Sequence, residues 1–292
     1  MKPQVIAVPY RYDEFEEGLG LGPGSLLKAG LQDRAESVAT AQLNDADRED
    51  DRTAINIGML GKSTAALVAR ARSSGTPVLV LAGDDTATVG VVSGIQKADG
   101  ASRALGVVWI DAHGDFNTPD TSYSGILAGM PLAVIAGLAG PRWREAAELD
   151  LPVAADRLLL LGLREIDKAE EELLKTHAVS RLTTDQLRSV SVLNEAIEAL
   201  ARRSEILYVN IDLDVLDPHV VPSITTPSAG GLEIEELSAI LTSLVQTGKV
   251  AVVSVTSLNP GAGARGQRSV QAALKVVEGL LGAWSAVPSP PR

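Results

Sequence analysis

Short apolar runs rich in Val, Ile and Leu alternate along the chain with longer stretches of helical periodicity. Runs that are apolar throughout predict strands covered on both faces, which is typical of a parallel sheet packed between helices. The predicted strands are residues 4–9, 37–42, 77–82, 105–111, 157–163, 206–212 and 250–256. The predicted helices are residues 56–72, 86–96, 125–138, 168–175, 192–203, 233–246 and 269–281. This alternation predicts an α/β fold.

The most natural α/β architecture for such an alternation is doubly wound. We expect a three-layer α/β/α sandwich around a mostly parallel sheet of about seven or eight strands. Aromatic residues make up only 3% of the 292 residues, so the core has to be built from aliphatic side chains. Neither a repeat nor a linker divides the sequence, which favours a single domain over residues 1–292. The charged run 44–52 is expected to be a solvated loop, and the end 288–292 to be frayed.

The cysteine and charge content argue against several classes of function. The chain has no Cys, which excludes disulfides, thiolate zinc sites, iron–sulfur clusters and a cysteine nucleophile. Its 26 Lys and Arg against 37 Asp and Glu give a net charge of −11, which argues against nucleic acid or an anionic membrane surface as a partner. Without an apolar run of transmembrane length or a signal-peptide pattern, the expected location is cytoplasmic.

Polar residues at the carboxyl ends of the predicted strands are the first candidates for a site, because ligands of doubly wound sheets bind there. Three of these ends are acidic. Their ionisable residues are Asp84 and Asp85 after the third strand, Asp111, His113 and Asp115 after the fourth, and Asp212, Asp214 and Asp217 after the sixth. A single Asp at such an end is most simply a cap for the next turn. The combination of D-x-H-x-D with D-x-D-x-x-D-P instead predicts a bound metal.

The ligand types indicate which ions this site would hold. Asp212 and Asp214 are two residues apart and would repel each other without a counter-charge. Carboxylate oxygens with one imidazole favour Mn²⁺, then Fe²⁺, Co²⁺ or Mg²⁺, over structural zinc. We expect two divalent ions, with Mn²⁺ as the first choice, because so many carboxylates converge. A two-metal site of this kind activates a water molecule as nucleophile.

These motifs resemble those of the arginase/agmatinase ureohydrolase family. The main blocks are residues 111–117 (DAHGDFN) and 212–218 (DLDVLDP), with further matches at residues 20–23, 82–86, 225–231 and 257–260. The blocks extend over most of the chain and their combination is specific. On the basis of these blocks, the chain is identified as a divergent member of this family.

The resemblance implies an α/β/α protein with two Mn²⁺ ions that hydrolyses a guanidino or formimino C–N bond by attack of metal-bound hydroxide. Asp111 and Asp212 would bridge the two ions. Asp115 would complete one metal site and belong to the catalytic residues. His113 and Asp214 would complete the other site. The expected partner is a small-molecule substrate, and the habit of the family predicts a homo-oligomer.

Position 85 departs from the family pattern at a metal ligand. The block that usually reads G-G-D-H-S reads A-G-D-D-T here, so Asp85 replaces a metal-binding His. With Asp85 as a ligand, five carboxylates face the four positive charges of two divalent ions, whereas the usual set of four Asp and two His is neutral. Alternatively, Asp85 turns away and one metal site is weak or empty.

Two further departures concern proton transfer and the substrate. Ala128 stands where arginases carry a His assigned to proton shuttling, and His219 is the candidate to replace it as a catalytic residue. Ser257 stands where the Glu of E-x-N-P pairs with a guanidinium, which favours a neutral or less basic head group. Asn117 and Ser124 match positions that hold an amino-acid carboxylate in arginases. The expected substrate-binding residues are therefore Asn117, Ser124 and Ser257.

Two functions remain open at this point. The first is a metal-dependent hydrolase that cleaves a C–N bond of a small guanidino, hydroxyguanidino or formimino compound. The second is a catalytically silent relative with a binding or structural role, suggested by the changes at positions 85, 128 and 257. The first is favoured, because ionisable ligands converging in an apolar sheet would be costly to keep without a metal.

Overall fold

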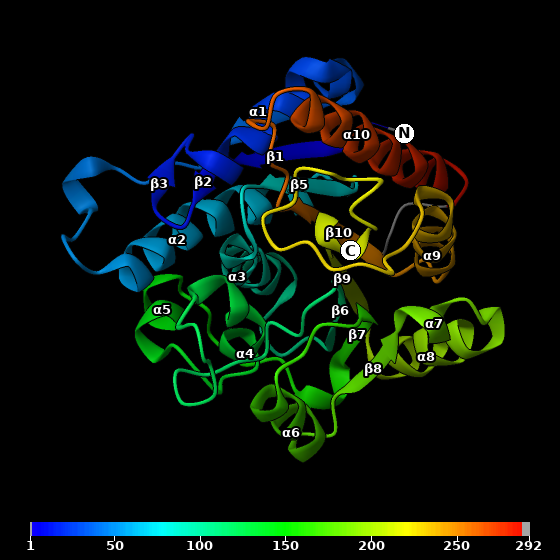
Figure 1. The fold of residues 1–292 in the computed structure, drawn as a ribbon. Helices are drawn as coiled ribbons and strands as arrows, with labels where there is room; N and C mark the ends of the chain where they lie inside the picture. The colour runs from blue at the N-terminus through cyan, green and yellow to red at the C-terminus, as the bar shows by residue number, and fades with distance from the viewer. Residues whose placement is uncertain (1, 288–292) are drawn as a thin grey trace.

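A parallel sheet of eight strands lies at the centre of the computed structural model, which describes residues 2–287 (Figure 1). From one edge to the other the strands are β4 (Ser37–Thr40), β1 (Gln4–Val8), β5 (Val78–Ala82), β10 (Val250–Thr256), β9 (Ile206–Asp212), β6 (Leu105–Ile110), β7 (Leu158–Leu163) and β8 (Ser180–Thr183). All neighbouring strands in this sheet pair in parallel. A separate antiparallel hairpin pairs β2 (Tyr10–Arg11) with β3 (Glu14–Phe15).

Helices cover both faces of the sheet, which confirms the predicted three-layer α/β/α sandwich (Figure 1). One face packs against α2 (Thr53–Arg72), α3 (Thr88–Asp99), α4 (Pro131–Ile135), α5 (Pro141–Ala146) and α6 (Lys168–Thr176). The other packs against α1 (Gly22–Leu26), α7 (Thr184–Leu187), α8 (Val190–Arg203), α9 (Ile234–Gln246) and α10 (Ala264–Ser285). The short helical turns are η1 (Gly18–Leu21), η2 (Leu27–Leu31), η3 (Gln32–Arg34), η4 (Asp45–Asp47), η5 (Asp85–Ala87), η6 (Leu127–Gly129), η7 (Ala155–Arg157) and η8 (Leu213–Val215).

Strand β5 shows why the apolar runs are continuous. Val78, Val80 and Ala82 belong to the core that includes α2 and α3. Leu79 and Leu81, which point to the opposite face, belong to the core that includes α9 and α10. Successive side chains of a strand alternate between faces, so a strand buried on both sides needs apolar residues at every position.

Two differences from the predicted elements have local causes. The predicted helix 125–138 is instead the turn η6 followed by the short helix α4. Pro131 starts α4, because proline lacks an N–H and is tolerated at the beginning of a helix but not inside it. Strand β8 is absent from the predicted strands because it is an edge strand with exposed ends and no continuous apolar run.

The remaining expectations concern exposed segments. The charged run 44–52 is almost entirely exposed, as expected of a solvated loop. The expected frayed end at 288–292 lies outside the described residues. Within residues 2–287, no helix has both the length and the apolarity needed to cross a bilayer.

The strand order decides which strand ends become neighbours. Because the strands are parallel, their carboxyl ends all lie at the same edge of the sheet. The four adjacent strands at the centre are β5, β10, β9 and β6, which are far apart in the chain. The segments that follow these four strands therefore converge on one place.

Candidate metal centre

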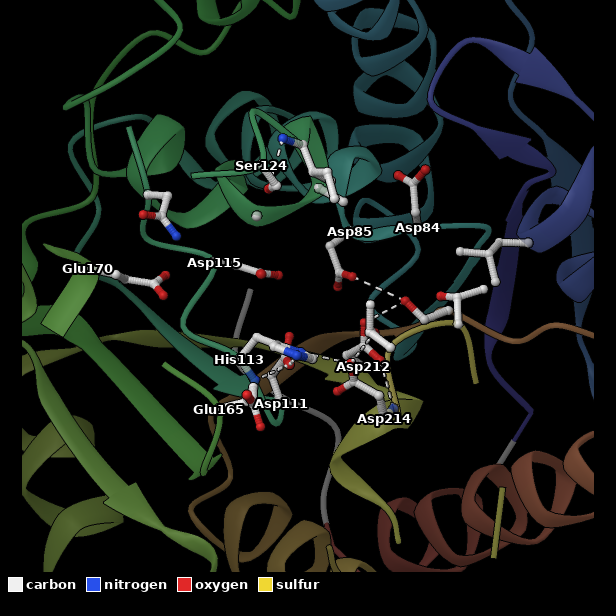
Figure 2. A pocket seen from close by; sticks show the side chains of 18 of the residues that line it. Asp84, Asp85, Asp111, His113, Asp115, Ser124, Glu165, Glu170, Asp212 and Asp214 are labelled. Atoms are coloured by element: carbon white, nitrogen blue, oxygen red, sulfur yellow. Dashed lines mark hydrogen bonds and ion pairs between the residues drawn. The ribbon is translucent and has the colours of Figure 1, made fainter. Parts of the chain in front are cut away.

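A cavity of about 340 Å³ lies at these strand ends. The predicted site residues that line it are Asp85, Asp111, His113, Asp115, Asn117, Ser124, Asp212, Asp214 and Ser257. Figure 2 shows the acidic side chains and His113 gathered around one space. The fold thus brings together side chains from all three acidic strand ends.

Backbone hydrogen bonds in the turns after β6 and β9 orient the carboxylates. Oδ1 of Asp111 accepts the N–H of His113 at 2.7 Å. Oδ1 of Asp212 accepts the N–H of Asp214 at 2.7 Å. Each of these aspartates is therefore a cap, as expected of a lone Asp at a strand end. A carboxylate has about four acceptor positions, so the cap leaves room for a metal.

Two groups of three side chains place ligand atoms close enough to hold a metal ion. The ligand atoms of Asp111, His113 and Asp214 all lie within 4.8 Å of one another. Those of Asp85, Asp111 and Asp115 do so as well. Asp111 belongs to both groups, so its carboxylate lies between the two positions. We call these groups the imidazole triplet and the carboxylate triplet.

The buried carboxylates of the cavity outnumber the single imidazole of His113 that faces them. Asp85, Asp111, Asp115 and Asp212 are each at most 8% exposed. Burial is the first cause, and the charge of neighbouring carboxylates the second, that raises the pKa of all four well above the ordinary range. Divalent cations in the cavity would supply the missing positive charge and allow the four groups to ionise.

His113 is the positively charged member of the imidazole triplet in the metal-free protein. Its Nδ1 lies 2.9 Å from Oδ2 of Asp214 and 3.4 Å from Oδ1 of Asp111. Burial lowers the pKa of His113, but hydrogen bonds to both carboxylates outweigh burial and raise the pKa to about 11. Burial raises the pKa of Asp214. The hydrogen bond from His113 outweighs burial and holds the pKa of Asp214 below its ordinary value.

Binding of Mn²⁺ is expected to release a proton from His113 at neutral pH. With a pKa of about 11, the imidazole is protonated in the metal-free protein, whereas a metal ligand has to be neutral. The affinity for Mn²⁺ should therefore rise with pH. Calorimetric titrations in two buffers of different ionisation enthalpy count the protons released, with His113→Asn as the control that lacks this proton. Identical heats in both buffers for the parent protein would contradict this assignment.

Asp115 fits a metal ligand because its carboxylate has no other partner. No described residue donates a hydrogen bond to this carboxylate, and the residue is 8% exposed. Its backbone is left-handed, with φ of +47°, which Asp tolerates better than most residues. A buried carboxylate without a donor is costly unless a ligand occupies it. An oxygen-rich set with one imidazole suits Mn²⁺.

Asp85 faces the cavity, so the alternative in which it turns away does not apply. Its Oδ1 accepts hydrogen bonds from Nδ2 of Asn210 at 2.6 Å and from Oγ1 of Thr256 at 2.8 Å. The adjacent Asp84 points in another direction (Figure 2) and, as the N-cap of η5, accepts the N–H of Thr86 at 3.0 Å. Asp84 is thus a structural cap, whereas Asp85 belongs to the carboxylate triplet.

The three predicted substrate-binding residues differ in their contacts. The side chains of Asn117 and Ser124 accept hydrogen bonds from within their own loop, at 2.9 and 3.3 Å. Oγ of Ser257 instead donates to Oδ2 of Asp212 at 2.5 Å and lies 3.3 Å from Oδ2 of Asp85. Ser257 is therefore engaged with the carboxylates, although it also lines the cavity.

His219 is not brought to the cavity. Its side chain is 65% exposed, and its ring nitrogens lie 2.7 Å from Oδ1 of Asp217 and 3.0 Å from Oε1 of Glu233. The prediction that His219 replaces the missing proton shuttle is therefore not supported by its position. The residue is close to Asp214 in sequence, but the turn between them directs the imidazole to solvent.

Five ionisable residues outside the sequence motifs also line the cavity: Arg11, Tyr12, Glu165, Asp167 and Glu170. Arg11 and Tyr12 follow β1, and Glu165 and Asp167 follow β7, so the rule of strand ends could have found them. Glu170 lies within α6, is 4% exposed and accepts the N–H of Phe116 at 2.8 Å. No sequence signal marks it. We call Glu165, Asp167 and Glu170 the acidic rim.

Known proteins match this chain in both sequence and fold. A family model described as the arginase family matches residues 2–282. An arginase from Staphylococcus aureus (strain COL) is 32% identical over 282 residues, covering 88% of this chain and 89% of that protein. The arginase structure from Bacillus caldovelox superposes with a TM-score of 0.83 at 27% identity, over 97% of this chain and 99% of that one. The formimidoylglutamase structure from Bacillus subtilis subsp. subtilis str. 168 shares the fold, with a TM-score of 0.78 and 19% identity over 99% of this chain and 88% of that one.

The family model extends over nearly the whole described chain. The same stretch contains the parallel sheet and the acidic cavity at its carboxyl edge. The chain therefore belongs to the arginase family.

Proposed function

We propose that this chain is a metal-dependent amidinohydrolase that cleaves the C–N bond of a small guanidino, hydroxyguanidino or formimino compound. The observation that carries the proposal is the pair of triplets that share Asp111 within one cavity. Two adjacent positions for divalent ions suit a hydrolysis in which both the attacking and the leaving group need stabilisation. Membership of the arginase family supports the same class of reaction.

We assign one ion to the carboxylate triplet and the other to the imidazole triplet, with Asp212 adjoining both. When bound, the two ions activate a water molecule for attack on the amidino carbon. The carboxylate of Asp115 has no protein donor, so one of its oxygens is free to take up the proton of that water. Asp111 and Asp212, capped by their own turns, hold the two positions at a fixed separation.

The contacts of Ser257 favour a substrate whose head group is neutral or weakly basic. The hydroxyl of Ser257 is directed at Asp212 and Asp85. Oδ1 of Asp85 accepts two hydrogen bonds from the protein, and its Oδ2 lies 3.3 Å from the hydroxyl of Ser257. Ser257 therefore offers no carboxylate to pair with a guanidinium, and the neighbouring Asp85 is already engaged with the protein. A cation without a partner is poorly stabilised there.

The acidic rim suits a cationic group at the other end of the substrate. Glu165, Asp167 and Glu170 line the same cavity as Asn117 and Ser124. Figure 2 shows Glu165 and Glu170 on the side of His113 and Asp115, away from Asp84. An α-amino acid would place its ammonium group at the rim and its carboxylate near Asn117 and Ser124. We therefore propose an amino acid with a neutral amidino-type head group as the substrate.

An assay of C–N bond cleavage tests the proposed function directly. The full chain is loaded with Mn²⁺ and incubated with arginine, agmatine, a hydroxyguanidino amino acid and a formimino amino acid, and the released urea, hydroxyurea or formamide is measured. Cleavage that depends on Mn²⁺ and is lost after chelation is the expected result. A protein that binds two Mn²⁺ ions but cleaves none of these compounds would support the catalytically silent alternative.

Asp167→Asn is expected to weaken binding of substrates that carry an ammonium group. Because Asp167 lies at the exposed part of the rim, the loss of its charge should raise KM by roughly fivefold, the equivalent of about 1 kcal/mol, with little change in kcat. Steady-state kinetics on matched substrates with and without the ammonium group measure this. Asp185→Asn, which changes a side chain that is 92% exposed outside the cavity, is the control. An equal rise in KM for both substrates would contradict the role of the rim.

A further inference from the structure

Asp85 and Ser257 occupy two of the three positions that depart from the family pattern, and their side chains are in contact. Oγ of Ser257 lies 3.3 Å from Oδ2 of Asp85 and 2.5 Å from Oδ2 of Asp212. Asp85 follows β5 and Ser257 follows β10, which are neighbours in the sheet. The contact thus joins positions that are 172 residues apart. The two departures form a single structural feature.

The sheet fixes the carboxylate of Asp85 from one side. Asn210 and Thr256, which donate to its Oδ1 at 2.6 and 2.8 Å, are both 0% exposed. With Oδ1 held in this way, Asp85 presents Oδ2 to Ser257 and to the cavity. The hydroxyl of Ser257 gives its one proton to Asp212 at 2.5 Å and lies 3.3 Å from Oδ2 of Asp85, so it bridges the two carboxylates on the cavity side.

The two departures leave the summed charge of positions 85 and 257 unchanged. The family pattern has a neutral His at 85 and an anionic Glu at 257, which together contribute one negative charge. In this chain Asp85 is the acidic member and Ser257 the neutral one, again one negative charge once bound cations allow Asp85 to ionise. Relative to the family pattern, the charge has moved from the position that faces the substrate to the position that faces the metal ions.

The backbone of Ser257 is left-handed and is tied to the turn that bears Asp85. Its φ is +65°, in the left-handed region where a side chain carries strain and glycine does not. Its N–H donates to the carbonyl of Gly83 at 3.0 Å, which ties this conformation to the turn that bears Asp85. Glycine would suit this backbone better and would lack only the side chain. Replacement of Ser257 by glycine therefore removes the hydroxyl without adding backbone strain.

We propose that Asp85 and Ser257 act as a coupled pair that sets the charge of the head group accepted by this enzyme. The proposal rests on the proposed function and deepens it. Ser257 is a positioning residue for Asp85 and Asp212, and the pair keeps its negative charge on the metal side. A Glu at 257 alone would place a third carboxylate against these two. A His at 85 alone would remove the negative charge of Asp85, and the neutral Ser257 would not supply a negative charge to the substrate.

A double-mutant cycle on the metal-free protein measures the coupling. The variants are Asp85→His, Ser257→Glu and the double variant, and the readout is the melting temperature in the presence of a chelator. Ser257→Glu is expected to lower the melting temperature in the parent, because it adds a carboxylate beside two others, and to lower it less in the Asp85→His background. Equal shifts in both backgrounds would overturn the coupling, whether or not any substrate is cleaved.

The same variants loaded with Mn²⁺ test the effect on specificity. The ratio of kcat/KM for arginine to that for the hydroxyguanidino amino acid is expected to rise at least about tenfold in the double variant, as for one gained hydrogen bond to a charged group. In each single variant the ratio should stay near that of the parent. A double-variant ratio equal to the product of the two single-variant ratios would overturn the proposal. An inactive parent would instead count against the proposed function, and the stability cycle would still decide the coupling.

Smaller substitutions test the positioning role where the larger ones do not fold. Ser257→Ala is expected to lower the affinity for Mn²⁺, and to lower it less in the Asp85→Asn background. Ser257→Gly should match Ser257→Ala, because both lack the hydroxyl. Ser191→Ala removes an exposed hydroxyl outside the cavity and should leave Mn²⁺ affinity unchanged. Parental Mn²⁺ affinity in Ser257→Gly would assign the effect to backbone strain and overturn the proposal.

Discussion

Asp111→Ala and Asp212→Ala are each expected to lower Mn²⁺ affinity by at least about 100-fold and to abolish hydrolysis. Substitutions of groups that only support a metal ligand already cost up to about 100-fold, and these two carboxylates are assigned as ligands. Asp111 belongs to both triplets, so its loss affects both ion positions. Elemental analysis of the purified variants measures the ions per chain. Retention of two ions by both variants would show that the ligand assignment is wrong.

Asp111→Asn is expected to cost more stability with metal than without it. In saturating Mn²⁺ the variant should melt below the parent, because a ligand at 100 times its Kd stabilises a protein by about 2.7 kcal/mol and the variant forgoes this. In chelator the loss should be smaller, because one of several mutually repelling buried carboxylates is gone and the acceptor for the N–H of His113 remains, although the acceptor for the indole N–H of Trp109 is lost. Thermal melts in both conditions, with the exposed Asp33→Asn as control, measure the difference between the two losses. An equal loss in both conditions would indicate a purely structural Asp111.

Arginine is expected to be a poor substrate, with kcat/KM at least about tenfold below that of the best hydroxyguanidino or formimino analogue. The physical reason lies at Ser257, whose hydroxyl is directed at Asp212 and Asp85 and supplies no charge to a guanidinium. A hydrogen bond to a charged group contributes about 1.5–3 kcal/mol, which corresponds to roughly 10- to 100-fold in kcat/KM.

Steady-state kinetics on a panel of equal chain length isolates this effect of the head group. All members of the panel carry the same α-amino acid end, so that their contacts with the acidic rim, Asn117 and Ser124 are shared. A kcat/KM for arginine above that of every analogue would refute the interpretation of Ser257.

The layers of the fold could be predicted because burial on two faces leaves a direct trace in the sequence. Strands such as β5 are apolar at every position, and the seven predicted strands all lie in the sheet. Strand β8 could not be found in this way, since an edge strand does not need two apolar faces. The segment around Pro131 has helical periodicity but only a short helix, because proline limits where the helix can begin.

The candidate site was predictable where its residues are neighbours in sequence. The spacing of Asp111, His113 and Asp115, and that of Asp212 and Asp214, is visible without any structure. The acidic rim is less visible, since Glu170 reaches the cavity from a helix and shows no motif. His219 marks the opposite error: it is near the motif in sequence, yet its imidazole is exposed.

The sequence by itself determined the class of fold, the acidic strand ends and the departures at Asp85, Ala128 and Ser257. Only the tertiary structure decided that Asp85 and Ser257 touch and that Ser257 is engaged with carboxylates. The reason is physical. Periodicity and spacing are local properties, whereas this contact depends on β10 lying between β5 and β9. The strands of a buried parallel sheet are all similarly apolar, so their composition does not encode their order, and the order is set by how the helices and connections pack.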